Sequence, residues 1–141
     1  MDRIATVKWL DNLTMVGETA SGHGVVMDGP PDIGGQNLGP RPMEMVLVGL
    51  GGCTTVDVIM ILKKAQQQVA DCRVEVSAER AETVPKVYTK IHVHYVVSGR
   101  NLDPKKVERA VKLSAEKYCS VSKMLEQAAE VTHDFEVVEV D

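Results

Sequence analysis

The stretch from Met45 to Leu62 constrains the fold of this chain more than any other part of it. It is eighteen residues long and carries a single charged side chain, Asp57. That length suffices for a membrane-spanning helix, but a carboxylate near the middle is costly in a bilayer, and glycines weaken the apolar character. A helix that is apolar on all sides is equally typical of one covered by protein. We therefore expect a buried helix, inside the protein or between subunits, and no membrane partner.

The residues around this stretch predict where the helix begins and ends. Pro42 suits the first turn, because the backbone N–H that proline lacks would have no partner there. The apolar pattern continues to about Val69. The sequence therefore predicts one long helix over residues 42–69.

Short strands are predicted before the helix. Residues 4–10 and 13–19 flank the dipeptide Asp11-Asn12, which suits a tight hairpin, and Ala5, Val7 and Trp9 alternate on one strand face. Residues 22–29 indicate a third short strand. Residues 29–42 form a loop rich in glycine and proline, and loops of this length are often functional.

Longer strands and a second helical region follow. Alternation predicts strands over residues 72–78, 86–99 and 131–140, each with one apolar face. Between the last two strands, Asp103 and Pro104 are typical of a helix start, and a helix over 104–118 ends just before Cys119, with a short further helix over 120–130. Strands and helices do not alternate regularly, so we expect a single α+β domain over residues 1–141.

Composition excludes several classes of function. The formal net charge is −4 and no block of Lys and Arg occurs, so no nucleic-acid partner is expected. The N-terminus has no apolar run of the kind a signal peptide needs, which predicts a cytoplasmic protein. Three cysteines, an odd number in a reducing compartment, indicate free thiols rather than a disulfide framework.

Cys53 and Cys119 are the two cysteines in contexts suited to chemistry. Cys53 follows two glycines, which permit close approach of a backbone or ligand, and Cys119 ends a helix before a polar turn. The spacing is unlike that of a zinc site but permits a long-range thiol pair. The alternative is that both are small core residues, as free cysteines often are, and Cys72 shares its strand face with Val74 and fits that description.

Three motifs give the chain a resemblance to a known family. The stretch RPMEMVLVGLGGC leads into the long helix, KYCSVSKML follows some sixty residues later, and AEVTHDFEV comes after it. Over essentially the whole chain, these motifs and the order of elements resemble the OsmC/Ohr family of thiol peroxidases, as a divergent OsmC-like member. The resemblance implies two sheets wrapped around central helices in an intertwined homodimer.

The resemblance also implies a reaction. Family members are peroxiredoxin-like antioxidant proteins that reduce organic hydroperoxides or related small electrophiles. The thiolate matching Cys53 attacks the peroxide, becomes a sulfenic acid, and condenses with the thiol matching Cys119 to a disulfide. A dihydrolipoyl group or another thiol reductant then restores the pair, without a cofactor or a metal.

An activating cation is required, because a free thiol with a pKa of about 8.5 is mostly protonated at neutral pH. In the family, an arginine of the N-terminal β region fills this role, held by a glutamate directly after the helix-start proline. Here residues 12–26 contain no arginine and Met43 follows Pro42, so Arg41 and Glu44 are the candidates. The missing arginine leaves an alternative open, a non-catalytic dimer that binds a small molecule.

Other polar residues are assigned weaker roles. Asp57 lies one turn after Cys53 on the same helix face, where its charge would raise the thiol pKa, and it is a candidate for binding a polar ligand group or a donor from a partner. His92 and His94, with His133, have the residue types of a zinc site, but they alternate with Lys90 as a solvated face does, so no metal is predicted. Tyr118 is predicted to complete the apolar face of its helix.

Overall fold

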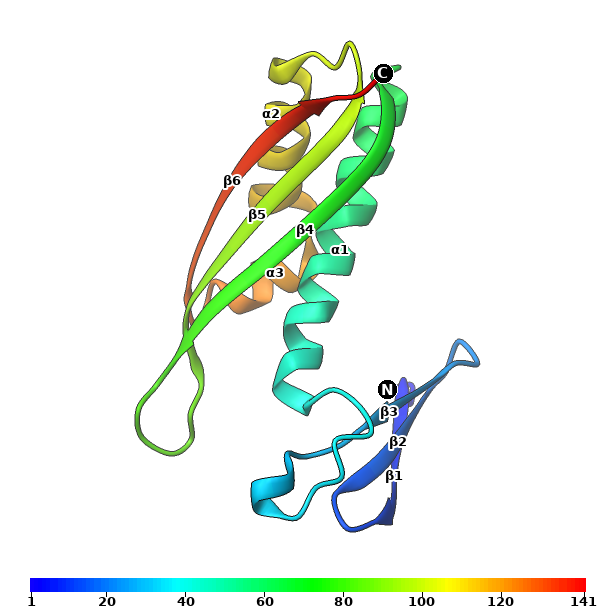
Figure 1. Ribbon diagram of the computed structural model, residues 1–141, viewed down its shortest axis with the longest axis vertical. Helices are drawn as coiled ribbons and strands as arrows, with labels where there is room; N and C mark the ends of the chain where they lie inside the picture. The colour runs from blue at the N-terminus through cyan, green and yellow to red at the C-terminus, as the bar shows by residue number, and fades with distance from the viewer. The chain divides into compact units, whose positions relative to one another are not determined.

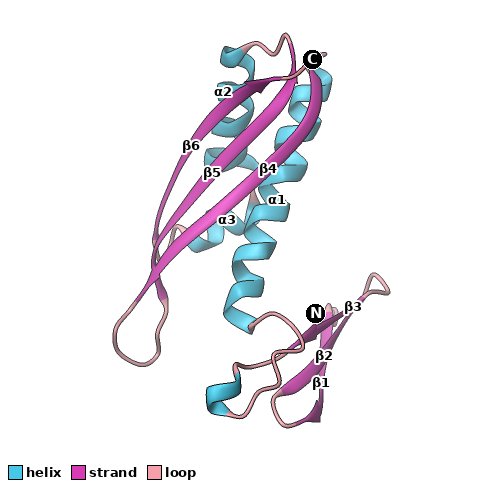
Figure 2. Cartoon of the chain, viewed as in Figure 1, coloured by secondary structure: helices cyan, strands magenta, loops and turns pink.

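The computed structural model describes all 141 residues, which form two compact units, residues 1–46 and residues 47–141. Strands and helices follow one another as shown in Figures 1 and 2. The strands are β1 (Ala5–Asp11), β2 (Thr14–Thr19), β3 (Gly24–Met27), β4 (Gln68–Arg80), β5 (Tyr88–Arg100) and β6 (Glu130–Glu139). The helices are α1 (Pro42–Lys64), α2 (Pro104–Leu113) and α3 (Ser120–Leu125), with a short 3₁₀ turn at Pro31–Ile33 and a π-helical turn at Ser114–Tyr118. The α+β class is confirmed, whereas a single domain over residues 1–141 stays a prediction.

The first unit holds the predicted hairpin and third strand. β1, β2 and β3 form an antiparallel sheet in which Trp9 lies opposite Met15. Asn12 turns the hairpin with a φ of 48°, a left-handed conformation that asparagine tolerates better than most residues. Every residue of β1 is exposed, including Trp9 at 73%. The face shared by Ala5, Val7 and Trp9 therefore has no cover within this chain.

Asp28 holds the long loop of the first unit to the hairpin. Its carboxylate is fully buried and accepts hydrogen bonds from the Thr14 hydroxyl and from the backbone N–H groups of Gly29 and Leu38. Burial alone would raise the pKa of Asp28, but these hydrogen bonds outweigh it and hold the pKa below its ordinary value. The loop therefore has an anchor that sequence analysis did not identify.

The second unit places helices on one face of a three-stranded sheet (Figure 1). β4 and β5 are antiparallel, and β6 is parallel to β5. Parallel strands need a crossover, which α2 and α3 supply. Apolar side chains from the inner sheet face and from α1 and α2 form the core, the largest being Leu50, Val58, Leu62, Ile91, Tyr95, Val97, Val107 and Val111.

α1 begins at the predicted proline but ends at Lys64, five residues before the predicted end. Gln66 adopts a left-handed conformation with a φ of 59°, and its N–H donates to the carbonyl of Lys63. The N–H of Gln67 donates to the carbonyl of Leu62, which completes the pair of bonds of a Schellman motif. Glycine is the usual residue at the left-handed position after a helix. Because Gln66 stands there instead, the sequence does not mark the end of α1.

The second helical region also differs from the prediction. α-Helical bonding stops at Leu113, and the next five residues form a π-helical turn closed by a bond of 2.9 Å from the Cys119 N–H to the Ser114 carbonyl. The turn shifts the side chains that follow it. Tyr118, the last residue of the turn, is 51% exposed, so it does not complete a buried apolar face within this chain.

α1 is only partly covered within this chain. Leu50, Val58 and Leu62 are buried, whereas Val48, Val56 and Met60 are each more than half exposed. By length and composition alone α1 could cross a membrane, but the core helix of a soluble protein passes the same test. The cover predicted on several sides is not supplied by the chain itself.

Candidate functional site

The structure brings Cys53 and Cys119 together. Cys53 lies half-buried on α1, and Cys119 is fully buried between the π-helical turn and α3. Burial, together with the nearby side chain of Cys53, raises the pKa of the Cys119 thiol to about 11. Cys119 is therefore a protonated thiol at neutral pH, with Cys53 as a neighbour.

A backbone group also contacts the second sulfur. Cys119 caps α3, and its Sγ accepts the Ser122 N–H at 3.4 Å. This contact lowers the thiol pKa, as hydrogen bonds to a sulfur acceptor do, but it does not offset burial. The Ser122 hydroxyl donates to the carbonyl of Ala115 at 3.3 Å, which ties α3 to the π-helical turn.

A hydrogen-bonded chain of polar side chains lies next to the cysteines. Thr54 Oγ1 is 2.6 Å from Tyr95 Oη and 2.6 Å from Ser114 Oγ, and the Ser114 hydroxyl donates to Asp57 Oδ2 at 2.9 Å. Thr54, Tyr95 and Ser114 are buried. Burial raises the pKa of Tyr95 to about 12, against the opposing effect of the Thr54 hydroxyl, so the phenol stays protonated. Asp57 thus has a donor from its own chain, which the sequence did not predict.

Thr54, Tyr95 and Ser114 were not predicted as site residues, although the sequence carries a weak signal for one of them. Tyr95 alternates with the histidines of the strand predicted over residues 86–99 and so shares its apolar face, and a buried tyrosine hydroxyl usually has a hydrogen-bond partner. Nothing in the sequence identifies that partner, because Thr54 lies 41 residues before Tyr95 and 60 residues before Ser114.

Arg41 and Glu44 have structural contacts of their own. The Glu44 carboxylate accepts the backbone N–H of Arg41 at 2.8 Å, which is one half of a capping box at the start of α1. The Arg41 guanidinium donates to Asn37 Oδ1 at 2.7 Å and to the Gly39 carbonyl at 3.2 Å. Both residues belong to the first unit and the two cysteines to the second, so a role for Arg41 and Glu44 at the thiols stays a prediction.

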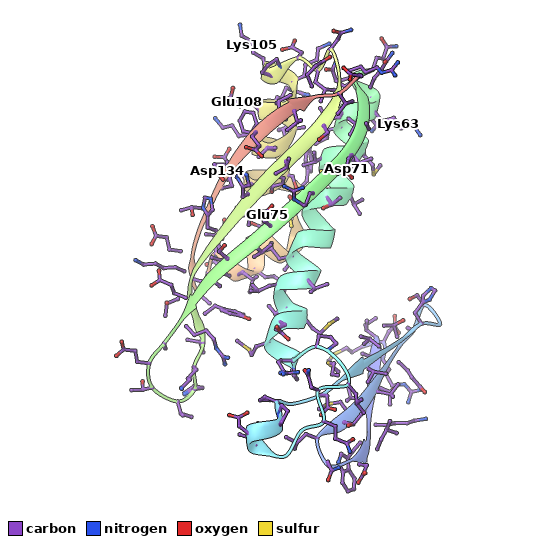
Figure 3. The ribbon with its side chains drawn as sticks, viewed as in Figure 1. Lys63, Asp71, Glu75, Lys105, Glu108 and Asp134 are labelled. Carbon is purple, nitrogen blue, oxygen red and sulfur yellow. The ribbon has the colours of Figure 1, made fainter.

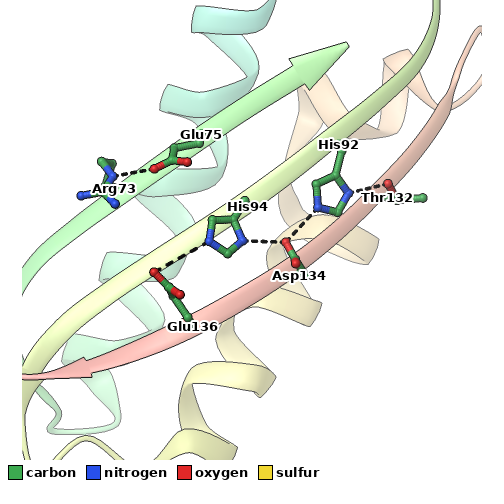
Figure 4. Close-up of polar contacts among 7 residues, drawn as sticks. All are labelled: Arg73, Glu75, His92, His94, Thr132, Asp134 and Glu136. Carbon is green, nitrogen blue, oxygen red and sulfur yellow. Dashed lines mark hydrogen bonds and ion pairs between the residues drawn. The ribbon is translucent and has the colours of Figure 1, made fainter. Parts of the chain in front are cut away.

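The histidines lie on the outer face of the sheet, as predicted. His92 Nε2 and His94 Nδ1 lie 2.8 and 2.7 Å from the same oxygen of Asp134, and His92 Nδ1 lies 2.7 Å from Thr132 Oγ1 (Figure 4). Figure 3 shows that Asp134 points away from the helices. His133 lies opposite Val93 and faces the other way, so the three histidines do not share one face.

Cys72 is separate from the thiol pair. It is half-buried on β4 opposite Val97, on the apolar strand face that the sequence predicted. Burial, and then the charge of Asp71, raise the pKa of its thiol. A protonated thiol among apolar neighbours is typical of a packing residue.

Comparison with known proteins agrees with this architecture. A family model described as OsmC-like protein matches residues 34–134. Protein YhfA of Escherichia coli (strain K12) is 51% identical over 134 residues, which cover 95% of this chain and 97% of that protein.

Solved structures extend the likeness. The crystal structure of a hypothetical protein from Aquifex aeolicus VF5 is 33% identical with a TM-score of 0.86, and both chains are covered over 100% of their length. The organic hydroperoxide resistance protein OhrB of Bacillus subtilis is 18% identical with a TM-score of 0.63, over 95% of this chain and 98% of that one, a likeness of fold alone. This chain belongs to the family of OsmC-like proteins.

Proposed function

We propose that this protein reduces organic hydroperoxides or related small electrophiles through Cys53 and Cys119. The observation that carries the proposal is the proximity of two thiols 66 residues apart in sequence, one half-buried and the other fully buried. Membership of the OsmC-like family supports a role in peroxide resistance or stress. A structural relative carries the name of organic hydroperoxide resistance protein.

The reaction divides into two balanced steps. The Cys53 thiolate attacks the outer peroxide oxygen, the O–O bond breaks, and the products are Cys53 sulfenic acid and an alcohol once the alkoxide takes a proton. The Cys119 sulfur then attacks the sulfenic sulfur, its proton leaves with the hydroxyl group as water, and a disulfide forms. A dihydrolipoyl group or another dithiol reduces the disulfide by exchange and becomes oxidised itself.

The two thiols have different tasks in this scheme. Cys53 is half-exposed, so a hydroperoxide can reach it. Cys119 is held protonated by burial and is shielded from solvent, which suits a thiol that reacts only with an oxidised neighbour. Arg41 is the proposed cation that favours the Cys53 thiolate, with Glu44 as its support. The reducing cytoplasm, where we expect the protein, would keep both thiols available.

We also propose that the working form is a homodimer. The first unit has only 46 residues and exposes Trp9, Leu10 and Val7, which is too little buried surface for an independent fold. α1 exposes Val48, Val56 and Met60 along its length. A second copy of the chain would cover both surfaces, and family members are commonly homodimers.

A turnover assay with three matched cysteine variants tests the catalytic proposal. With cumene hydroperoxide and dihydrolipoamide, Cys53→Ser should lose activity to the background rate, and Cys119→Ser should stop after the first oxidation. Cys72→Ser, the control, should keep wild-type activity. A wild-type rate equal to that of Cys53→Ser would contradict the proposal.

The same variants separate the enzyme from a non-catalytic binding protein. Native mass spectrometry of the protein isolated from its own cells would, in the binding case, show a co-purified small molecule that Cys53→Ser retains. An inactive wild-type protein with such a ligand would replace the peroxidase proposal.

A further inference from the structure

The chain Tyr95–Thr54–Ser114–Asp57 has a fixed direction. The Ser114 hydroxyl has one hydrogen, and it points to Asp57, with a longer contact of 3.4 Å to the Thr54 carbonyl. Thr54 must therefore donate to Ser114, and Tyr95 to Thr54. Every hydroxyl in this hydrogen-bonded series has a partner, and no buried side-chain polar atom of the whole protein lacks one. Apolar residues of the same shape would fill this space without the need to pair each donor with an acceptor. The presence of four polar side chains here therefore suggests a role beyond packing.

The polar chain connects the segments that carry the two sulfurs. Thr54 directly follows Cys53 on α1. Ser114 begins the π-helical turn, and its carbonyl accepts the backbone N–H of Cys119 at 2.9 Å. Two hydrogen bonds therefore connect the segments of the two cysteines. The first joins Thr54 to the side chain of Ser114, and the second joins the carbonyl of Ser114 to the N–H of Cys119.

The π-helical turn is part of this connection. π-Helical turns are rare and occur frequently at functional sites, because the extra residue moves the side chains beyond it. Here the turn ends at Cys119, which leaves the helix with φ −72° and ψ 106° and lies near Cys53. The Thr54–Ser114 hydrogen bond anchors the first residue of that turn to α1.

We propose that Thr54 and Ser114 are positioning residues that hold Cys119 within reach of oxidised Cys53. This role rests on the proposed function and refines its second step. A sulfenic acid at Cys53 has two fates: the Cys119 sulfur attacks it and water leaves, or a second hydroperoxide oxidises it to a sulfinic acid and is reduced to an alcohol. The first fate requires two sulfurs in a narrow range of separation and orientation, and fixing them raises its rate without any effect on the second. Asp57 supports the pair by accepting the Ser114 hydroxyl.

The partition between these two fates tests the proposal. Thr54→Val replaces the hydroxyl with a methyl group of the same shape, and Thr54→Ser keeps the hydroxyl. After treatment with increasing multiples of cumene hydroperoxide, mass spectrometry gives the ratio of Cys53–Cys119 disulfide to Cys53 sulfinic acid. The ratio should fall roughly tenfold in Thr54→Val and stay within about twofold of wild type in Thr54→Ser, since positioning of reacting groups accounts for large rate factors. Ser114→Ala should repeat the Thr54→Val result and serves in its place if Thr54→Val does not fold.

A matched core variant separates positioning from loss of stability. Val107 is fully buried on α2 and is not part of the polar chain, so Val107→Ala loosens the fold elsewhere. It should keep the wild-type ratio at a temperature where all variants are folded by circular dichroism. A wild-type ratio in Thr54→Val and in Ser114→Ala, or an equal fall in Val107→Ala, would overturn the proposal.

A peroxide-free reaction distinguishes failure of this proposal from failure of the proposed function. Oxidised glutathione forms a mixed disulfide with Cys53 and releases one glutathione, and attack by Cys119 then releases the second glutathione and closes the protein disulfide. Thr54→Val should accumulate the mixed disulfide roughly tenfold relative to wild type, for the same positioning reason. If wild type ignores hydroperoxides but shows this difference, only the peroxidase function fails. If the mixed disulfide closes equally fast in both proteins, the positioning role fails.

Discussion

The Ser114 hydroxyl donates to Asp57 across 2.9 Å, so the only charged side chain in the apolar stretch of α1 has a partner inside its own chain. A carboxylate one turn from a reactive thiol has no evident benefit when α1 is considered alone. In the fold it accepts a hydrogen bond from the last of three buried hydroxyls, which otherwise has only a longer contact of 3.4 Å to the Thr54 carbonyl. Asp57 is therefore part of the architecture around the thiols.

Replacement of Asp57 should reveal this dependence as a loss of stability. Asp57→Leu leaves the Ser114 hydroxyl with only the weak contact of 3.4 Å to the Thr54 carbonyl, and loss of the better acceptor should cost up to the value for an unpaired buried group, about 1–3 kcal/mol. Asp57→Asn keeps an acceptor oxygen and should cost less. Urea unfolding at one protein concentration measures both variants, and equal stability of Asp57→Leu and wild type would contradict this role.

Glu44 should contribute to stability through the start of α1. Glu44→Ala removes the acceptor for the Arg41 N–H and should lower the free energy of unfolding by about 0.5–1 kcal/mol, the scale of a helix cap. Glu44→Gln retains an acceptor and is the control. The idea fails if the alanine variant unfolds at the same urea concentration as the glutamine variant.

The pair of His94 and Asp134 should make stability depend on pH. The hydrogen bond to Asp134 raises the pKa of His94, burial opposes this rise, and the charges of Asp134, Glu136 and Glu75 add to it. His94 and then His92 lower the pKa of Asp134. The contribution of His94 is present below its unfolded value of 6.5 and is lost as the pH rises through the raised folded value. The contribution of Asp134 is present above its unfolded value of 3.8 and is lost as the pH falls through the lowered one.

The window of greatest stabilisation therefore lies between the two unfolded values, from pH 3.8 to 6.5. Thermal melts of wild type and Asp134→Asn should differ most near the middle of this window and converge in alkaline solution. A difference in melting temperature that stays constant from acid to alkaline pH would show that the interaction contributes nothing.

Gln66 offers a stabilising substitution. Its left-handed conformation is strained for a residue with a Cβ and is free of cost for glycine, so Gln66→Gly should raise the free energy of unfolding by up to about 1 kcal/mol. Gln66→Ala keeps the strain and should not gain. If the alanine variant is as stable as the glycine variant, the end of α1 is not strained at this residue.

Local patterns account for most of the fold that could be predicted. Alternation identified β4, β5 and β6, and Asp103 and Pro104 identified the start of α2, because these signals depend on neighbours in sequence. The end of α1 and the π-helical turn were missed. Neither carries a residue type that usually marks such geometry. The helix ends at a left-handed glutamine where glycine is usual, and the π-helical turn depends on the hydrogen bond from the Cys119 N–H to the Ser114 carbonyl.

The site was predicted in part for the same reason. The two cysteines could be paired because their motifs resemble those of a family, and in the structure they lie near each other. Their joint catalytic role stays a prediction. Thr54, Ser114 and Tyr95 are ordinary residues in ordinary patterns, and only the packing of α1 against β5 and the π-helical turn makes them one chain. Roles at the thiols for Arg41 and Glu44 stay predictions.

Peptide mapping after one equivalent of cumene hydroperoxide tests the central claim most directly. The account predicts that two thiols per chain disappear and that one new cross-linked peptide joins Cys53 to Cys119, while Cys72 remains free. Unmodified Cys53 and Cys119 after this treatment, or a disulfide that includes Cys72, would contradict it.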